Sequence, residues 1–242
     1  MSCLMAQRGS TLLAILPLLV VMGLMVATSS QRLANERRIA ANQADRQYAM
    51  QAAEAALARG EQQAVRLDRE LGIAGKPDAE LFGPAGLFSD DCRNPANPAG
   101  WQSGLCRVGL ADREPPWLKV VTLGGRRWPL LHPCGHAREL VLDSRAALRC
   151  NTGDVLAGGT LWANPRYLIE LLQRDYRDEL GRSGRLYRIS ARGWGRNRYS
   201  QATLQSYLLV PDTAAEHGAG RVQASSPAEE ALPLRLGWRE LF

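Results

Sequence analysis

The sequence contains very little lysine. Of its 30 lysine and arginine residues, only Lys76 and Lys119 are lysines, so the formal net charge of +6 comes from arginines scattered along the chain. No basic run is interleaved with aromatic residues, as a channel for nucleic acid would require. We therefore expect no binding to nucleic acid.

Motifs that carry chemistry are also missing. The sequence has no glycine-rich phosphate loop, no nucleophile elbow and no pair of acidic residues in a context typical of acid–base catalysis. We therefore expect a structural role, with no enzymatic activity and no cofactor. A signal-anchored periplasmic enzyme or binding domain is the alternative, because spacing alone does not exclude a site within residues 73–163.

A long uncharged run lies close to the amino terminus. Residues 12–27 carry no charge, and with their polar neighbours they make a stretch of about 20 residues, which as a helix crosses a bilayer core of roughly 30 Å. A cleaved secretory signal is the rival interpretation, but no small-x-small cleavage site with a change of composition follows the run. Helix-forming residues instead continue through residues 31–71 and stop at Gly72. The pattern predicts one helix that crosses a membrane and continues into water.

A narrow stripe of small or apolar residues follows the second part of this helix. Its members are Ala41, Ala44, Tyr48, Ala52, Ala55 and Ala56. Small side chains at helical spacing allow close packing. The stripe favours a helix that lies on its own domain, and an assembly surface is the alternative.

Three segments together resemble type IV pilins. Residues 8–13, Arg-Gly-Ser-Thr-Leu-Leu, are similar to a prepilin leader junction, in which a basic residue and a glycine precede the cleavage site. Residues 36–42, Glu-Arg-Arg-Ile-Ala-Ala-Asn, and residues 51–57, Gln-Ala-Ala-Glu-Ala-Ala-Leu, resemble PilX-like minor pilins. The resemblance implies that a prepilin peptidase cleaves after Gly9 and that Ser10 becomes an N-methylated amino terminus. It also implies an α+β, type IV pilin-like fold, in which a long N-terminal helix, half membrane-embedded and half amphipathic, packs on an antiparallel β-sheet.

The chain departs from the major pilins at the fifth residue of the mature protein. Major pilins have glutamate there, and its carboxylate neutralises the terminal amine of a neighbour already in place, because an unpaired charge is costly in lipid. Here the position is Ala14, so the chain has no carboxylate to offer a subunit above it. PilX-like pilins and K-type pseudopilins of type II secretion share this lack. The resemblance thus implies a place at or near the tip of a pilus, with the pseudopilin as the alternative.

Four cysteines remain once the leader, which contains Cys3, is removed. They are Cys92, Cys106, Cys134 and Cys150. In an oxidising compartment such as the periplasm, this even number predicts two disulfides, for which three connectivities are possible. Sequential pairing closes loops of about 15 residues, each worth roughly 3 kcal/mol.

A zinc site is the alternative use of two of these cysteines. Its ligands would be His132, Cys134, His136 and Cys150. Their spacing fits no standard zinc motif, and thiols are seldom left reduced in the periplasm. We therefore assign no metal.

The cysteines also predict the orientation in the membrane. Arg8 precedes the apolar run, whereas Arg32, Arg37 and Arg38 follow it. Positive charges favour the cytoplasmic side, so this distribution by itself favours a cytoplasmic C-terminal domain. We give more weight to the disulfides, which form outside the cytoplasm. The expected location is the inner membrane, with a single pass and a periplasmic C-terminal domain, and then the extracellular pilus. The expected partners are other minor pilins, the major pilin, a tip adhesin and the prepilin peptidase.

Strand-like runs follow in the second half of the chain. Residues 117–123 and 126–130 flank two glycines and predict a β-hairpin, and residues 138–142 are a shorter candidate. Residues 186–193 and 202–207 resemble the closing hairpin of the PilX-like sheet.

Residues 164–180 allow two interpretations. Asn164 can cap a helix, Pro165 suits its first turn, and apolar residues repeat every four positions from Leu168 to Leu180, which predicts a helix. The first half, however, resembles a strand of the PilX-like sheet. We therefore expect a strand at residues 167–171.

The tail departs from the family resemblance, since the PilX-like sheet usually ends near Val210. Residues 211–231 are rich in alanine, glycine, serine, proline and glutamate, which predicts a flexible linker. Leucines and a tryptophan then alternate with other residues from Leu232 to Trp238. This alternation favours an extra edge strand on the chain's own sheet, and a strand donated to a partner is the alternative.

The predicted organisation has five parts. They are a leader (residues 1–9), a transmembrane or filament-core helix half (residues 10–30), an amphipathic helix half (residues 31–72), a disulfide-containing globular domain (residues 73–210) and a C-terminal linker with an extra strand (residues 211–242).

Overall fold

A computed structural model describes residues 10–93, 103–107, 117–123, 125–146, 148–150, 154–155, 159–212 and 232–241. The chain divides into two compact units, Met1–Ala44 and Asp45–Phe242. Helix α1 (Ser10–Leu71) begins in the first unit and ends in the second, and the second unit also contains every described strand.

Helix α1 ends where the sequence predicts. Leu71 is its last residue, and Gly72 follows with a φ of 57°, a left-handed conformation that glycine adopts at little cost. A short 3-10 helix, η1 (Ile73–Gly75), and helix α2 (Asp78–Phe82) come next.

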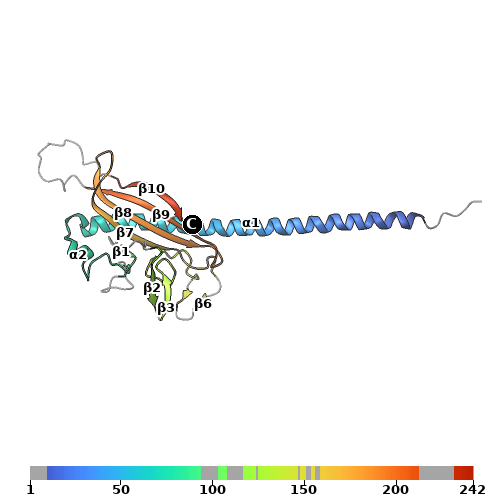
Figure 1. Cartoon of the computed structure of the whole chain (residues 1–242), viewed down its shortest axis with the longest axis horizontal. Coiled ribbons are helices and arrows are strands. Elements are labelled where there is room, and N and C mark those ends of the chain that lie inside the picture. Colours follow the sequence, from blue (N-terminus) through green and yellow to red (C-terminus); the bar gives the residue numbers. More distant parts are fainter. Residues whose placement is uncertain are drawn as a thin grey trace, which may run out of the picture. The chain divides into compact units, whose positions relative to one another are not determined.

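The central sheet has the order β1-β7-β8-β9-β10, and Figure 1 labels these strands. Strand β4 also pairs with β7. Its strands are β1 (Leu105–Arg107), β4 (Arg138–Glu139), β7 (Arg166–Arg177), β8 (Ser183–Trp194), β9 (Gln201–Pro211) and β10 (Leu234–Leu241). The pairings are antiparallel except for that of β1 with β7, which is parallel. The structure thus has the α+β fold that the resemblance implies, with a long helix packed on a largely antiparallel sheet.

Two small hairpins lie outside this sheet. One pairs β2 (Val120–Leu123) with β3 (Arg126–Pro129), and the other pairs β5 (Leu148–Arg149) with β6 (Asp154–Val155). The first is the hairpin that the sequence predicts. Gly125, in its turn, has a φ of 76°, which explains the need for glycine there.

The helix predicted from the four-residue repeat in residues 164–180 is wrong, because this segment forms strand β7. Successive side chains of a strand point to opposite faces, so residues four positions apart lie on the same face. Residues between the repeats are apolar as well. Tyr167 and Ile169 pack in the α1 core, while Leu168 is buried on the other face of the strand. A strand buried on both faces has a near-continuous apolar run in place of a clean alternation.

The tail supplies the expected edge strand. Strand β10 pairs antiparallel with β9 in a register that runs from Leu234 opposite Leu209 to Leu241 opposite Thr203. The predicted linker falls on residues 211–231, of which residues 213–231 lie outside the described residues.

The two faces of the sheet contact different layers. On one face, residues such as Ile189 and Leu204 pack against α1. On the other face, Leu168 packs with Leu130 and Leu131, which follow β3. The sheet therefore lies between α1 and a second layer that contains the β2–β3 hairpin.

Candidate functional site

The predicted processing junction lies at the start of α1. Gly9 falls outside the described residues, Ser10 is the first residue of α1, and Ala14 lies within its first turns. Cleavage after Gly9 and N-methylation of Ser10 stay predictions.

The apolar part of α1 is exposed within its unit. The large apolar residues from Ile15 to Val26 are between 51% and 69% exposed. Within the described residues, α1 is the one helix long and apolar enough to cross a membrane. A contiguous exposed surface of this kind is unfavourable in water, so it requires lipid or other apolar helices around it.

The second part of α1 packs on the sheet through small residues. Ala49, Ala53, Ala56 and Ala64 are fully buried in the core that α1 shares with β7, β8 and β9. Ala52 and Ala56 of the predicted stripe are buried, but Tyr48 is 42% exposed, because the buried face follows steps of three and four residues through Ala49 and Ala53. Ala52 and Ala56 thus pack on the chain's own domain, whereas Ala41 and Ala44, like Tyr48, are exposed.

Glycines on both elements, Gly193 of β8 and Gly60 of α1, allow the helix to approach the sheet closely. A Cβ atom added at Gly193 would lie 2.3 Å from the carbonyl oxygen of Ala49 and 2.4 Å from the backbone nitrogen of Ala53. Gly60 of α1 has the same role, since a Cβ atom there would lie 2.6 Å from a methyl carbon of Ile189. Helix and sheet are thus in contact through backbone as well as side chains.

A buried carboxylate anchors the C-terminal end of α1. Asp68 accepts hydrogen bonds from the Arg185 guanidinium at 2.7 and 3.1 Å and from the Tyr187 hydroxyl at 2.6 Å. Arg185 also pairs with Asp212, the residue that follows β9. The network joins α1 to β8 and to the beginning of the tail.

A second carboxylate anchors α1 at the other end of the sheet. Asp45 is 8% exposed and accepts hydrogen bonds from the Arg196 backbone N–H and the Asn197 side-chain amide, both in the turn between β8 and β9. The Arg196 guanidinium lies 5.1 Å from the centre of the Tyr48 ring. Sequence reasoning missed Asp45 and Asp68, and the available signal was a charged residue at each end of an alanine stripe of helical period.

The four cysteines form the two sequential disulfides. Cys92 bonds to Cys106 with a Cα–Cα distance of 4.3 Å, and Cys134 bonds to Cys150 with 5.4 Å. The sulfurs of Cys134 and Cys150 are therefore bonded to each other and do not take part in the zinc alternative. No cluster of metal-binding side chains occurs in the part of the chain that the structure describes.

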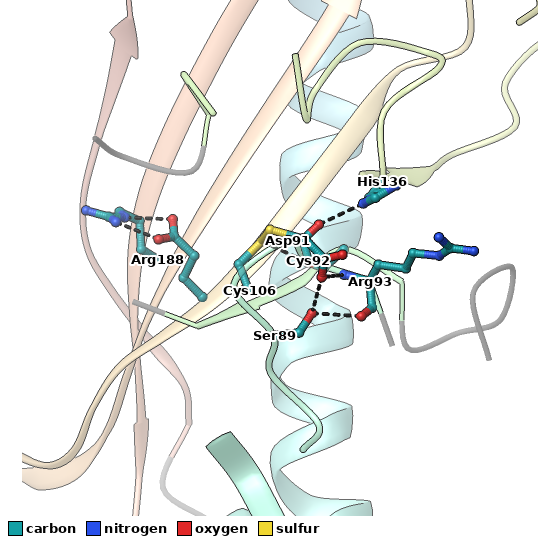
Figure 2. The surroundings of a disulfide bond; sticks show 9 residues. Ser89, Asp91, Cys92, Arg93, Cys106, His136 and Arg188 are labelled. Atoms are coloured by element: carbon teal, nitrogen blue, oxygen red, sulfur yellow. Dashed lines mark hydrogen bonds and ion pairs between the residues drawn. A yellow bond between two sulfur atoms is a disulfide. The ribbon is translucent and has the colours of Figure 1, made fainter. Parts of the chain in front are cut away.

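The first disulfide lies between a turn and a buried ion pair. Ser89, Asp91 and Arg93 lie on one side of it, and His136 donates from Nδ1 to the Asp91 carbonyl at 2.8 Å (Figure 2). On the other side, Arg188 donates two hydrogen bonds, of 2.8 and 2.6 Å, to the fully buried carboxylate of Glu170. Burial raises the pKa of Glu170, and the hydrogen bonds and charge of Arg188 act in the opposite direction.

This globular domain matches a known family. The sequence model that describes the C-terminal part of the type IV pilus assembly protein PilX covers residues 83–210, more than half of the chain. The chain belongs to this family. No curated protein and no solved structure matches the chain significantly.

Membership of the PilX family identifies a type IV pilus assembly protein, a structural component that interacts with other parts of the pilus. The match ends at Val210, so strand β10 lies beyond it. The matched region contains both disulfides and most of the sheet, while α1, with its exposed apolar run, precedes it. The combination fits a membrane-anchored pilin.

Proposed function

We propose that this PilX-family chain is a minor pilin that is incorporated at or near the tip of the pilus and helps to prime pilus assembly. The observation that carries the proposal is Ala14, which lies five residues into the mature protein if cleavage follows Gly9. An added subunit uses a carboxylate at this position to neutralise the terminal amine of the subunit above it, because lipid does not solvate that charge. The first subunit has none above it, so it does not need the carboxylate.

The five-part organisation follows the same proposal. A prepilin peptidase removes residues 1–9, residues 10–30 occupy the inner membrane before assembly and the filament core after it, and residues 31–72 support the globular domain of residues 73–210. Residues 211–242 add a linker and strand β10. The exposed apolar residues from Ile15 to Val26 support the membrane assignment.

The disulfides support a periplasmic location for the globular domain. Cys92–Cys106 and Cys134–Cys150 lie in a region with few long strands, and such bonds persist in oxidising compartments. The domain is then carried to the extracellular pilus with the rest of the subunit. Its partners in assembly are other minor pilins, the major pilin and a tip adhesin.

A K-type pseudopilin of type II secretion is the second candidate, because it shares the missing carboxylate. The PilX family match supports the pilus over the secretion system. The neighbouring genes discriminate between the two, since pilus genes and secretion genes differ.

Immunogold labelling of the chain on isolated pili tests the tip assignment. We expect gold particles at filament ends in wild-type cells. In an Ala14→Glu strain we expect additional particles along the shafts, whereas Ala14→Gln, of similar size but neutral, keeps the wild-type distribution. Uniform labelling of wild-type shafts would overturn the tip assignment.

A further inference from the structure

Aromatic and cationic side chains gather on the face of the sheet that is turned away from α1. The Trp128 ring stacks on the His132 ring with 4.4 Å between centroids. The Trp162 ring lies 6.1 Å from His132 and 5.8 Å from Trp194, which makes a continuous aromatic group. These residues come from β3, the loop after it, the segment before β7, and β8.

Two arginines lie beside this aromatic group. Arg166 on β7 and Arg192 on β8 are directly opposite each other in the antiparallel register. Their neighbours Tyr167 and Ala191 pack in the α1 core, so both arginines project from the opposite face. Both charges act on His132: burial first, and then Arg192 and Arg166, lower its pKa to about 4.

The cluster has more hydrogen-bond donors than acceptors. Arg166 donates from Nη1 to the Ala137 carbonyl at 3.0 Å and from Nη2 to Glu139 at 2.7 Å, but its buried Nε has no acceptor among the described residues. Within the same part of the chain, the buried Nε1 of Trp128 has no acceptor either. Each buried donor left without an acceptor costs about 1–3 kcal/mol, so such atoms call for an explanation.

Arg192 and His132 add further donors. Arg192 donates from Nε to the Thr203 hydroxyl at 2.9 Å, and no carboxylate among the described residues pairs with it. The Nδ1 atom of His132 accepts from the Cys134 backbone N–H at 3.1 Å, so the neutral ring carries its proton on Nε2. Glu139 pairs with Arg166, whereas Arg192 has the neutral Thr203 hydroxyl as an acceptor.

We propose that Trp128, His132, Arg166 and Arg192 form a binding site for an oxyanion, either a carboxylate or a sulfate. An oxyanion supplies several acceptor oxygens and a negative charge, which are what this cluster lacks. Planar guanidinium groups match the geometry of such anions, and aromatic neighbours strengthen the interaction by excluding water. Arg192, His132 and Trp162 are partly exposed, so a small anionic group can reach them. The site shares no residue with the predicted processing junction or with α1.

Titration of the full-length protein in a nonionic detergent tests this site. Sodium sulfate, sodium glucuronate and glucose are the probes, with sodium chloride adjusted to hold the ionic strength constant. Tryptophan fluorescence is the readout, because three tryptophans lie in the cluster. We expect a saturable change with sulfate or glucuronate and none with glucose.

Two variants and one control make the test specific. Arg192→Gln is expected to weaken anion binding at least tenfold, and Trp128→Phe, which keeps a ring but removes the N–H donor, is expected to weaken it several-fold. Arg198→Gln, in the exposed turn after β8, is the matched control and is expected to bind as the wild type does. If Arg192→Gln fails to fold by circular dichroism, Trp128→Phe decides the question.

The outcomes separate the two sources of the anion. Tighter binding of sulfate supports a site for a free inorganic anion, whereas tenfold tighter binding of glucuronate supports a site for a sugar acid. The proposal is overturned if the wild type gives no saturable response, if both variants respond like the wild type, or if glucose binds as tightly as glucuronate.

Discussion

At the scale of single residues, the ion pair between Asp68 and Arg185 is buried between helix and sheet. The two side chains are 2% and 4% exposed, and the pair joins the last turns of α1 to β8. A buried pair of this kind does little to raise stability over an apolar core, but removal of one partner leaves a charge buried and poorly compensated. We predict that the pair helps to fix how α1 lies on the sheet.

We predict that Asp68→Asn lowers the free energy of unfolding by about 3 kcal/mol, since the buried guanidinium of Arg185 then loses the charge of Asp68. Urea unfolding of the full-length protein in detergent measures the change. Glu70→Gln is the control, because Glu70 is 67% exposed and lies 4.0 Å from Arg66, a geometry expected to contribute less than about 0.5 kcal/mol. An Asp68→Asn protein as stable as the control would contradict this role.

We predict that His132 makes stability depend on pH. Its pKa is lowered to about 4 in the folded protein, because the ring is buried and lies near Arg192 and Arg166. The unfolded chain takes up the proton near pH 6.5, so the contribution of neutral His132 is complete above that pH and is lost as the pH falls toward 4.

Thermal unfolding at pH 7, 6, 5 and 4.5 checks this prediction against His132→Asn, whose side-chain oxygen can accept the hydrogen bond from Cys134. We expect the wild type to lose more of its midpoint temperature on acidification than the variant does. Parallel curves for the two proteins would show that His132 does not cause the pH dependence.

At the scale of elements, the contact between α1 and β8 depends on the absence of a side chain. Gly193→Ala is predicted to cost about 2–3 kcal/mol of unfolding free energy, because the new methyl group would meet the backbone of Ala49 and Ala53. Gly237→Ala on β10 is the matched control, since nothing lies within 4 Å of its added Cβ. Denaturant midpoints of the two variants give the comparison, and equal midpoints would argue against close helix–sheet contact.

Strand β10 is bonded to β9 and to α1. Arg235 pairs with Glu61, and Glu240 lies 3.2 Å from Arg46, so both ends of the strand contact the helix. Deletion of residues 232–242 is predicted to lower the thermal midpoint by at least about 2–4 °C, which corresponds to roughly 1 kcal/mol for a chain of this size. Leu232→Ser, at an 81% exposed position, is expected to leave the midpoint unchanged. An unchanged midpoint after the deletion would instead favour a strand that acts on a partner.

The sequence predicts the elements better than it predicts their contacts. Helix α1 and its end at Gly72 follow from composition, and the β2–β3 hairpin follows from its glycine turn, because these signals are local. The repeat that begins at Leu168 was ambiguous, since a period of four suits a helix and one face of a strand.

Contacts between distant segments carry no local signal. A single carboxylate such as Asp68 resembles a solvated residue of a helix, and only the fold brings it to Arg185. The same is true of the cluster around His132, because Arg166 and Arg192 meet through strand register. The even number of cysteines predicted two disulfides but left their connectivity open.

At the scale of the whole molecule, two surfaces have different requirements. The run from Ile15 to Val26 is exposed and needs lipid or apolar helices around it, whereas the globular domain has its own core on both faces of the sheet. A membrane-anchored pilin meets both requirements, since lipid surrounds its apolar helix while its domain keeps its own core. The exposed tryptophan of β10, Trp238, lies outside the region that matches the PilX family.

Processing at the amino terminus tests the central claim most directly. Mass spectrometry of the protein from cells with and without prepilin peptidase measures where the mature chain begins. The account predicts N-methylated Ser10 in cells with the peptidase and an uncleaved leader in cells without it. A mature chain that begins near Ser30, or an intact Met1 in cells with an active peptidase, would contradict the assignment as a pilin.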